Sequence, residues 1–190
     1  MKRPGTIFIV SGPSGSGKTT LCKGLLKKRR SMLSAPSMTT RAPRKGEKKN
    51  IDYIFVSETE FKKQLKEGGL LEHAVVFGNY YGTPKKPIAD ALKQGKDVLL
   101  SIDIQGAAQV KKAFKAAVLI FVLPPTFTDL KERLLKRSSD TAEQIRKRLR
   151  KARQELKAVD AYDHTVVNDD IKKAVERLYS IVAAATTKKR

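Results

Sequence analysis

Short apolar runs alternate along this chain with segments whose apolar residues recur at helical spacing. Runs with the length of a strand are 6–11, 70–77, 97–103, 117–123 and 164–168. Segments with helical spacing are 19–30, 58–67, 88–94, 105–114, 129–137, 142–161 and 170–185. Strands separated by helices predict a parallel sheet with helices on both faces, so the fold class that we predict is α/β.

Capping residues agree with these helices. Ser57 with Glu60 forms a capping-box pattern, and Gly68 follows the same helix. Thr128 is the cap that we expect for the helix after Pro124-Pro125. The stretch 37–77 breaks the alternation because it is polar and rich in turn residues at its start, which indicates a small insertion rather than another strand–helix unit.

Length and composition fit one globular domain. The chain has 190 residues, of which 40% are hydrophobic, and no apolar run is long enough to span a bilayer. The amino terminus lacks the apolar segment of a signal peptide. Cys22 is the only cysteine, and with two histidines it offers no zinc site. We therefore expect a cytoplasmic protein without a membrane partner.

The charge is strongly unbalanced, with 40 Lys and Arg against 19 Asp and Glu, for a formal net charge of +21. The positive electrostatic potential produced by such an excess favours anionic substrates or polyanionic partners. It also fits lysines on solvated helix faces and in a basic tail. No basic stripe interleaved with aromatic residues accompanies the charge, so we predict no specific nucleic-acid partner.

A complete G-x-x-x-x-G-K-[ST] motif follows the first strand and opens the first helix. Its glycines allow backbone N–H groups to surround phosphates at a helix amino terminus. We expect Lys18 to reach the β- and γ-phosphates of a nucleoside triphosphate and Thr19 to bind Mg²⁺. The predicted ATP-binding residues of this loop are Gly12, Pro13, Ser14, Gly15, Ser16, Gly17, Lys18, Thr19 and Thr20.

Two further features have a chemical and a structural interpretation. Asp103 ends an apolar strand, where an acid can serve the metal, through a water molecule, or cap the following helix. Arg41, Arg44 and Tyr53 can clamp a phosphate monoester, or they can belong to a solvated basic loop.

Taken together with the phosphate-binding loop, the segment that contains Arg41 and Arg44 resembles the guanylate kinases. The segment from Ser37 to Phe55 reads Ser-x-Thr-Thr-Arg-x-x-Arg-x-Gly-Glu and then Asp-Tyr-x-Phe, similar to the GMP-binding segment of that family. The resemblance spans residues 7–178. Other stretches that carry it are Leu71-Glu72, Gly78–Thr83, Asp103–Gly106, Arg133–Arg137, Ile145–Leu149 and Val166–Asp170.

The resemblance implies a role for each matching residue. Arg41, Arg44, Tyr53 and Tyr81 would hold the GMP phosphate, and Ser37, Glu72, Thr83 and Asp103 would read or orient the guanine. Arg133, Arg137 and Arg148 would belong to a lid over ATP, and Asn168 would lie near the adenine. The implied catalytic residues are Lys18, Arg41, Arg133, Arg137 and Arg148.

The resemblance also implies one P-loop domain over residues 1–190, with a parallel-sheet core flanked by helices. Its core would comprise 1–36, 85–125 and 158–190, with a GMP-binding insertion at 37–84 and a helical lid at 126–157. The implied reaction transfers the γ-phosphoryl group of ATP to GMP, and also to dGMP, with Mg²⁺. It would serve guanine nucleotide metabolism.

Three positions depart from the family pattern. Asn50 stands where glycine is usual, and asparagine tolerates a left-handed φ. Ser138 replaces a glycine after Arg137, and Ser101 replaces an acid two residues before Asp103.

Other functions compete with this interpretation. A P-loop kinase with a ribose phosphate acceptor is disfavoured by Glu72 and Ser37, which suit guanine. A scaffold module without catalysis is disfavoured by the intact Lys18 and its glycines. Binding of nucleic acid through net charge is the third alternative. The sequence predicts no oligomeric state.

Overall fold

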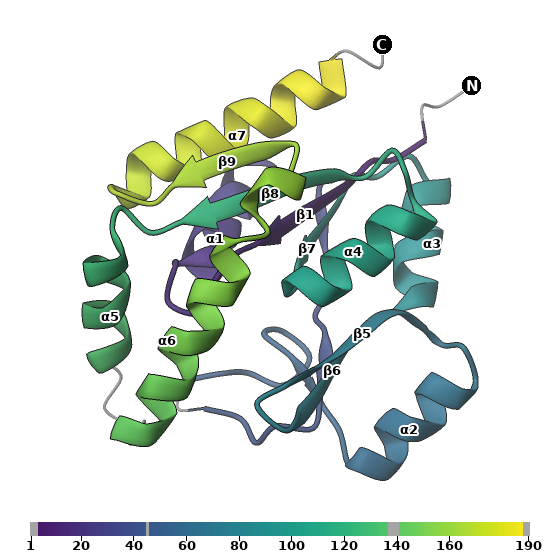
Figure 1. Cartoon of the computed structure of the whole chain (residues 1–190). Helices are drawn as coiled ribbons and strands as arrows, with labels where there is room; N and C mark the ends of the chain where they lie inside the picture. Colours follow the sequence, from purple (N-terminus) through teal and green to yellow (C-terminus); the bar gives the residue numbers. More distant parts are fainter. Residues whose placement is uncertain (1–3, 45, 137–140, 188–190) are drawn as a thin grey trace. The chain divides into compact units, whose positions relative to one another are not determined.

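The computed structural model describes residues 4–44, 46–136 and 141–187 (Figure 1). The chain divides into two compact units. The first unit comprises Ser31–Ala117 and the residues up to Ile7, and the second comprises Phe8–Arg30 and the residues from Val118 onward. The boundaries of these two units differ from those predicted for the core, the insertion and the lid. The division into core, insertion and lid stays a prediction.

Parallel strands occur in both units. In the second unit, β1 (Ile7–Ser11), β8 (Val118–Leu123) and β9 (His164–Val167) are hydrogen-bonded in that order, and in the first unit β2 (Leu33–Ser34) pairs with β7 (Val98–Ser101). In the second unit, Phe8 of β1 lies opposite Val118 of β8, and Ile120 of β8 opposite His164 of β9. In the first unit, Leu33 lies opposite Val98. All of β1 is buried, as expected for a strand covered on both faces. The predicted α/β fold with a parallel sheet is confirmed.

The helices of the second unit are α1 (Lys18–Lys28), α5 (Phe127–Leu135), α6 (Ala142–Leu156) and α7 (Ile171–Thr187). Two expectations were wrong in detail. Thr126, not Thr128, caps α5, because its hydroxyl accepts a hydrogen bond from the Asp129 N–H at 3.0 Å. The helix predicted to reach residue 161 ends at Leu156, and a separate 3₁₀ turn follows at Val159–Ala161.

The first unit contains a second sheet, with strands in the order β4 (Ile54–Phe55), β3 (Met38–Thr39), β6 (Asn79–Pro84) and β5 (Leu70–Val76). Strands β5 and β6 form an antiparallel hairpin that turns at Phe77 and Gly78, both of which have positive φ. Of these strands only β5 was predicted. The others are too short or too polar to show a period of two.

Side-chain alternation gives the two faces of this second sheet different roles. Glu72 lies opposite Thr83, and Tyr81 shares their face. We call this face, with Glu72, Thr83 and Tyr81, the acceptor face. The remaining helices of the first unit are α2 (Glu58–Lys66), α3 (Lys85–Lys93) and α4 (Ile104–Ala113).

Helix α2 covers the face opposite to the acceptor face. Its Phe61 is fully buried, with its ring centroid 5.3 Å from that of Tyr80 and its ring edge against Gly82. The predicted capping box of α2 between Ser57 and Glu60 is confirmed. The acceptor face is therefore supported from behind by one buried aromatic residue.

We expect Phe61→Ala to lower the free energy of unfolding of the protein by about 3–5 kcal/mol, because it leaves a cavity behind the acceptor sheet. Denaturant unfolding measures this loss. Lys63→Ala, on the exposed side of the same helix, is the matched control and should change the stability by less than about 0.5 kcal/mol. Equal stability of both variants would mean that α2 does not support the sheet.

Candidate active site

The phosphate loop, residues 12–19, is held in a conformation that requires glycine. Gly12 and Gly17 have φ of 139° and 93°. The space around them is also closed, because a Cβ on Gly12 would lie 2.3 Å from the Val122 carbonyl oxygen, and one on Gly17 would lie 2.1 Å from Asn168 Nδ2. The glycines of the motif are thus needed for both backbone conformation and packing.

Helix α1 begins directly at this loop. Gly17 is its N-cap and provides no side-chain hydrogen bond, so the start of the helix depends on another acceptor for its N–H groups. The Lys18 ammonium donates hydrogen bonds to the carbonyl oxygens of Gly12 at 2.6 Å and Pro13 at 3.0 Å, which places it over the loop. Thr19 and Thr20 are exposed in the first turn of the helix.

Asn168, predicted near the adenine, supports the phosphate loop. It follows β9 and is only 4% exposed. Its Nδ2 donates to the Ser16 carbonyl oxygen at 2.8 Å, and its own carbonyl oxygen accepts from Arg133 at 2.9 Å. Its Oδ1 is buried without a hydrogen-bond partner in the described part of the chain. An adenine contact of Asn168 stays a prediction.

Two of the three predicted lid arginines lie near the same loop. Arg133 of α5 reaches Asn168, and Arg148 of α6 donates to the Ser14 hydroxyl at 3.3 Å. Leu130, Leu134 and Ala152 form a buried cluster, completed by Phe127 and Leu149. Arg137 and Ser138 lie outside the described residues.

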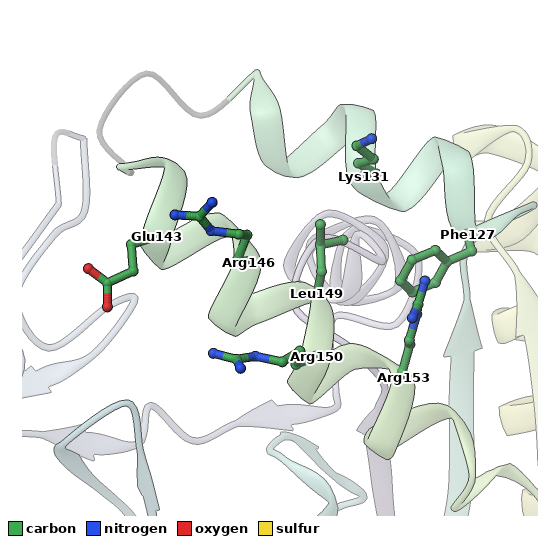
Figure 2. A pocket seen from close by; sticks show the side chains of 7 residues that line it. All are labelled: Phe127, Lys131, Glu143, Arg146, Leu149, Arg150 and Arg153. Atoms are coloured by element: carbon green, nitrogen blue, oxygen red, sulfur yellow. The ribbon is translucent and has the colours of Figure 1, made fainter.

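A hollow of about 410 Å³ lies at the surface of α5 and α6 (Figure 2). Phe127 and Leu149 give it an apolar floor, and the Arg153 guanidinium lies 4.8 Å from the Phe127 ring centroid. Figure 2 shows Arg146 and Arg150 projecting from the same side of α6. Part of the +21 charge is therefore gathered on this surface.

The acceptor face carries three residues predicted for guanine in one hydrogen-bonded row. The Thr83 hydroxyl donates to Glu72 Oε1 at 2.6 Å and lies 3.4 Å from the Ser37 hydroxyl oxygen. Glu72 is only 4% exposed and Thr83 is fully buried. The structure thus brings together Ser37, Thr83 and Glu72 as the sequence predicted.

Burial governs the protonation of Glu72. Burial is the largest cause that raises the pKa of this carboxyl, and the negative charge of Asp103 adds to the shift, while hydrogen bonds from Thr83 oppose it. The resulting pKa is about 7. Near neutral pH this carboxyl therefore exists in both protonation states. A ligand with two N–H donors would favour the ionised one.

Asp103 caps helix α4. Its carboxylate accepts hydrogen bonds from the backbone N–H groups of Gln105 at 3.1 Å and Gly106 at 3.0 Å, and from the Gln105 side chain at 3.0 Å. Of the roles expected from sequence, the cap is confirmed, and the metal role and the guanine role implied by the resemblance stay predictions. Ser101 is exposed at the end of β7.

The residues predicted for the acceptor phosphate gather around Arg41. Its Nε donates to the Tyr81 hydroxyl at 3.2 Å, and its guanidinium lies 5.3 Å from the Tyr53 ring centroid. The two tyrosine rings meet edge to face at 6.1 Å. Arg44 is exposed on the neighbouring loop.

Glu47 belongs to this cluster and was missed by the sequence reasoning, although it ends the quoted Arg-x-x-Arg-x-Gly-Glu motif. It binds the Arg41 guanidinium through both oxygens, at 3.0 and 2.9 Å, and accepts the Arg44 N–H at 2.7 Å. Partial burial would raise the pKa of Glu47, but the hydrogen bonds of Arg41 and Arg44 outweigh it and lower the pKa. An ionised Glu47 thus fixes the orientation of Arg41.

The turn before Tyr53 keeps its geometry without glycine. Asn50 has φ of 61°, in the left-handed region that asparagine tolerates, and its N–H donates to the Tyr53 carbonyl oxygen at 2.8 Å. The expectation for this departure from the family pattern is confirmed.

Together these features define a class of protein. A phosphate loop between β1 and α1 of a parallel sheet is the site of a P-loop nucleotide-binding protein. The arginine–tyrosine cluster and the buried carboxyl suit a second, phosphorylated substrate that offers hydrogen-bond donors. The class is a P-loop kinase.

Comparison with known proteins identifies the family. The guanylate kinase family model matches residues 4–185. The guanylate kinase of Clostridium tetani is 47% identical over 180 residues, covering 95% of this chain and 86% of the relative. That of Caldanaerobacter subterraneus is 45% identical, covering 97% and 89%. The solved guanylate kinase of Anaplasma phagocytophilum matches with a TM-score of 0.81 at 36% identity, covering 97% and 87%.

The chain therefore belongs to the guanylate kinase family, whose members transfer a phosphoryl group from ATP to GMP. This confirms the resemblance, the predicted fold class and the predicted activity. The roles of the individual residues stay predictions.

The pKa of Glu72 leads to a pH dependence of GMP binding. The predicted guanine role of Glu72 requires the ionised carboxylate, so with a pKa of about 7 the KM for GMP should fall roughly tenfold from pH 6 to pH 8 and then level off. Steady-state kinetics at saturating ATP measure this. The GMP phosphate also titrates near pH 6, so Glu72→Gln is the control and should lose the part of the profile that is due to Glu72. An identical profile in both proteins would exclude this titration.

Proposed function

We propose that the acceptor face binds GMP along its length, with the guanine at Glu72 and the phosphate at Arg41. One observation carries this proposal: a buried carboxyl bonded to Thr83 and an arginine bonded to Tyr81 lie on one face of the same small sheet. The two groups match the two chemically distinct ends of GMP.

At the guanine end, the donors of the base meet the acceptors of the protein. Guanine presents N1–H and the N2 amine as adjacent donors, and an ionised carboxylate is a two-oxygen acceptor. Thr83 orients Glu72, and Ser37 extends the row of hydroxyl groups. Adenine has an unprotonated N1 in that place, so it would leave buried polar groups unpaired.

At the phosphate end, Arg41, Arg44, Tyr53 and Tyr81 bind the phosphate of GMP. Tyr53 and Tyr81 pack on each other beside the Arg41 guanidinium, so the cluster is ordered before the ligand arrives. Burial raises the pKa of Tyr53, with Tyr81 adding to the shift, which keeps its hydroxyl protonated as a donor.

On the ATP side, the phosphate loop binds the β- and γ-phosphates. Lys18 then exchanges the carbonyl oxygens of Gly12 and Pro13 for phosphate oxygens. Arg133, Arg137 and Arg148 stabilise the charge on the transferred group. An oxygen of the GMP phosphate attacks the γ-phosphorus, the bond to the β-phosphate oxygen breaks, and ADP and GDP leave. No covalent enzyme intermediate is needed.

Mg²⁺ bound to the ATP phosphates supplies charge neutralisation in this reaction. Among the described residues, no group of three or more His, Cys, Asp or Glu could hold a metal alone. Mg²⁺ needs only one or two protein groups besides phosphates and water. The exposed Thr19 hydroxyl at the start of α1 fits this role. Asp103 fits it only through water, because its carboxylate already accepts three N–H bonds.

We propose a cytoplasmic enzyme that accepts dGMP as well as GMP and has no specific nucleic-acid partner. Within residues 4–44, 46–136 and 141–187, no helix is long and apolar enough to cross a membrane. The described contacts of the acceptor face are made by side chains suited to the base and the phosphate, which favours acceptance of either sugar.

The first test of this function is specificity. The unmodified enzyme should use GMP with a kcat/KM roughly 10⁴-fold or more above that for AMP. Glu72→Gln replaces one acceptor by an amine and should lower kcat/KM for GMP by about ten- to a hundredfold, equal to about 1–3 kcal/mol. It should leave the poor reaction with AMP unchanged. A coupled ADP-release assay with both nucleotides measures these values.

The matched control for that variant is Glu58→Gln, which makes the same change on the exposed side of α2. It should keep the specificity of the unmodified enzyme. Equal use of AMP and GMP, or unchanged GMP kinetics in Glu72→Gln, would contradict the assignment of Glu72.

The second test concerns the phosphate loop. Lys18→Ala should lower kcat by roughly a hundredfold or more while the protein stays folded, because it removes a charged donor aimed at the transferred group. Lys172→Ala, an exposed lysine on α7, is the control and should retain full turnover. Near-normal turnover of folded Lys18→Ala would refute the assigned role.

A further inference from the structure

Helix α4 approaches the Glu72 carboxyl so closely that only glycine fits between them. Gly106 is buried in the first turn of α4. A Cβ added there would lie 2.2 Å from Glu72 Oε2 and 2.8 Å from its Cδ, closer than real Cβ atoms come to other heavy atoms. Any larger residue at position 106 must therefore displace the carboxyl or the helix.

Neither the backbone nor the helix itself explains this glycine. Gly106 does not have a positive φ, so its backbone conformation is open to any residue. Alanine would favour the helix by about 1 kcal/mol. The close approach to Glu72 is the feature of the structure that requires glycine.

Gln109, one turn further along α4, holds the backbone beside Glu72. Its Nε2 donates to the His73 carbonyl oxygen at 2.7 Å, and its Oε1 accepts from the His73 N–H at 3.1 Å. His73 lies on β5, which is the last strand in the order of its sheet. The two bonds from Gln109 pair with the His73 backbone as a neighbouring strand would. Gln109 thus fixes the residue next to the carboxyl.

Three residues determine the surroundings of the Glu72 carboxyl. Thr83 donates to Oε1, Gly106 leaves space for Oε2, and Gln109 anchors the adjacent peptide. The three contacts involve different groups, namely Oε1, Oε2 and the backbone of the next residue. Loss of any one would let the carboxyl move.

We propose that Gly106 and Gln109 are positioning residues for guanine specificity, which set the place of the Glu72 carboxyl from helix α4. The proposal rests on the assignment of Glu72 to guanine. Neither residue touches the substrate. Both act through Glu72, so they affect GMP and not ATP.

The principal experiment is Gly106→Ala. The displaced carboxyl should raise the KM for GMP about ten- to a hundredfold, as expected for a misplaced charged acceptor, with the KM for ATP unchanged. Ala108→Gly, at an exposed position of the same helix, is the control. This variant changes the helix propensity but adds no atom near β5. It should therefore leave both KM values unchanged.

A second-site variant separates positioning from general damage. Glu72→Asp shortens the side chain and frees the space that the Cβ added by Gly106→Ala requires. It should therefore cost much less in kcat/KM for GMP in the Gly106→Ala background than in the unmodified protein. Such non-additivity is expected for residues in contact. Additive losses would overturn the proposal.

Gln109→Leu gives an independent measurement. It should raise the KM for GMP several-fold, keep the KM for ATP, and speed the exchange of the His73 amide hydrogen. Because Gln109 is exposed, this variant carries the test if Gly106→Ala does not fold. An unchanged KM for GMP in both variants would refute the positioning role, while unchanged GMP kinetics in Glu72→Gln would refute the guanine assignment itself.

Discussion

The recognition of GMP that we propose depends on one energetically costly arrangement, the burial of the Glu72 carboxyl. A charged group without water is destabilising unless it is paired, and among the described residues this one has hydrogen bonds from the hydroxyl and backbone N–H of Thr83 and a like charge in Asp103. Its hydrogen-bonding capacity is thus incomplete until a ligand supplies donors. In the role that we propose, the same burial that raises the pKa of Glu72 would give guanine an advantage over any base that lacks two adjacent N–H groups.

The cations that we propose to bind phosphates are held differently, by acceptors within the protein. Arg41 is held by Glu47, and Lys18 is held by the carbonyl oxygens of its own loop. These partners keep flexible side chains in one place before the phosphates arrive, which reduces the entropy lost on binding. In the proposed site, ordered cations at the phosphates and an acceptor at the base that lacks donors would be complementary, since the phosphates would supply affinity and the base specificity.

Much of this was predictable because the relevant chemistry lies in short contiguous motifs. The loop at residues 12–19 and the segment 37–55 carry their function in residue type and spacing, and the parallel sheet follows from alternating strands and helices. The strands β3, β4 and β6 were missed because their pairing partners, not their own sequences, stabilise them. The cap at Thr126 in place of Thr128 shows the same limit on a smaller scale, since several nearby residues can cap one helix.

Gly106 illustrates why the supporting residues cannot be found from the sequence alone. Its motif, Asp103-Ile-Gln-Gly106, was recognised, but glycine has no side chain to suggest a role, and the role that we propose is to leave a space that Glu72 fills from another element. Gln109 likewise looks like an exposed helix residue until its amide is seen against His73. Residues that bind substrate are recognisable by their chemistry. Residues that position them are defined by three-dimensional neighbours, so they become visible only when α4 and β5 are placed side by side.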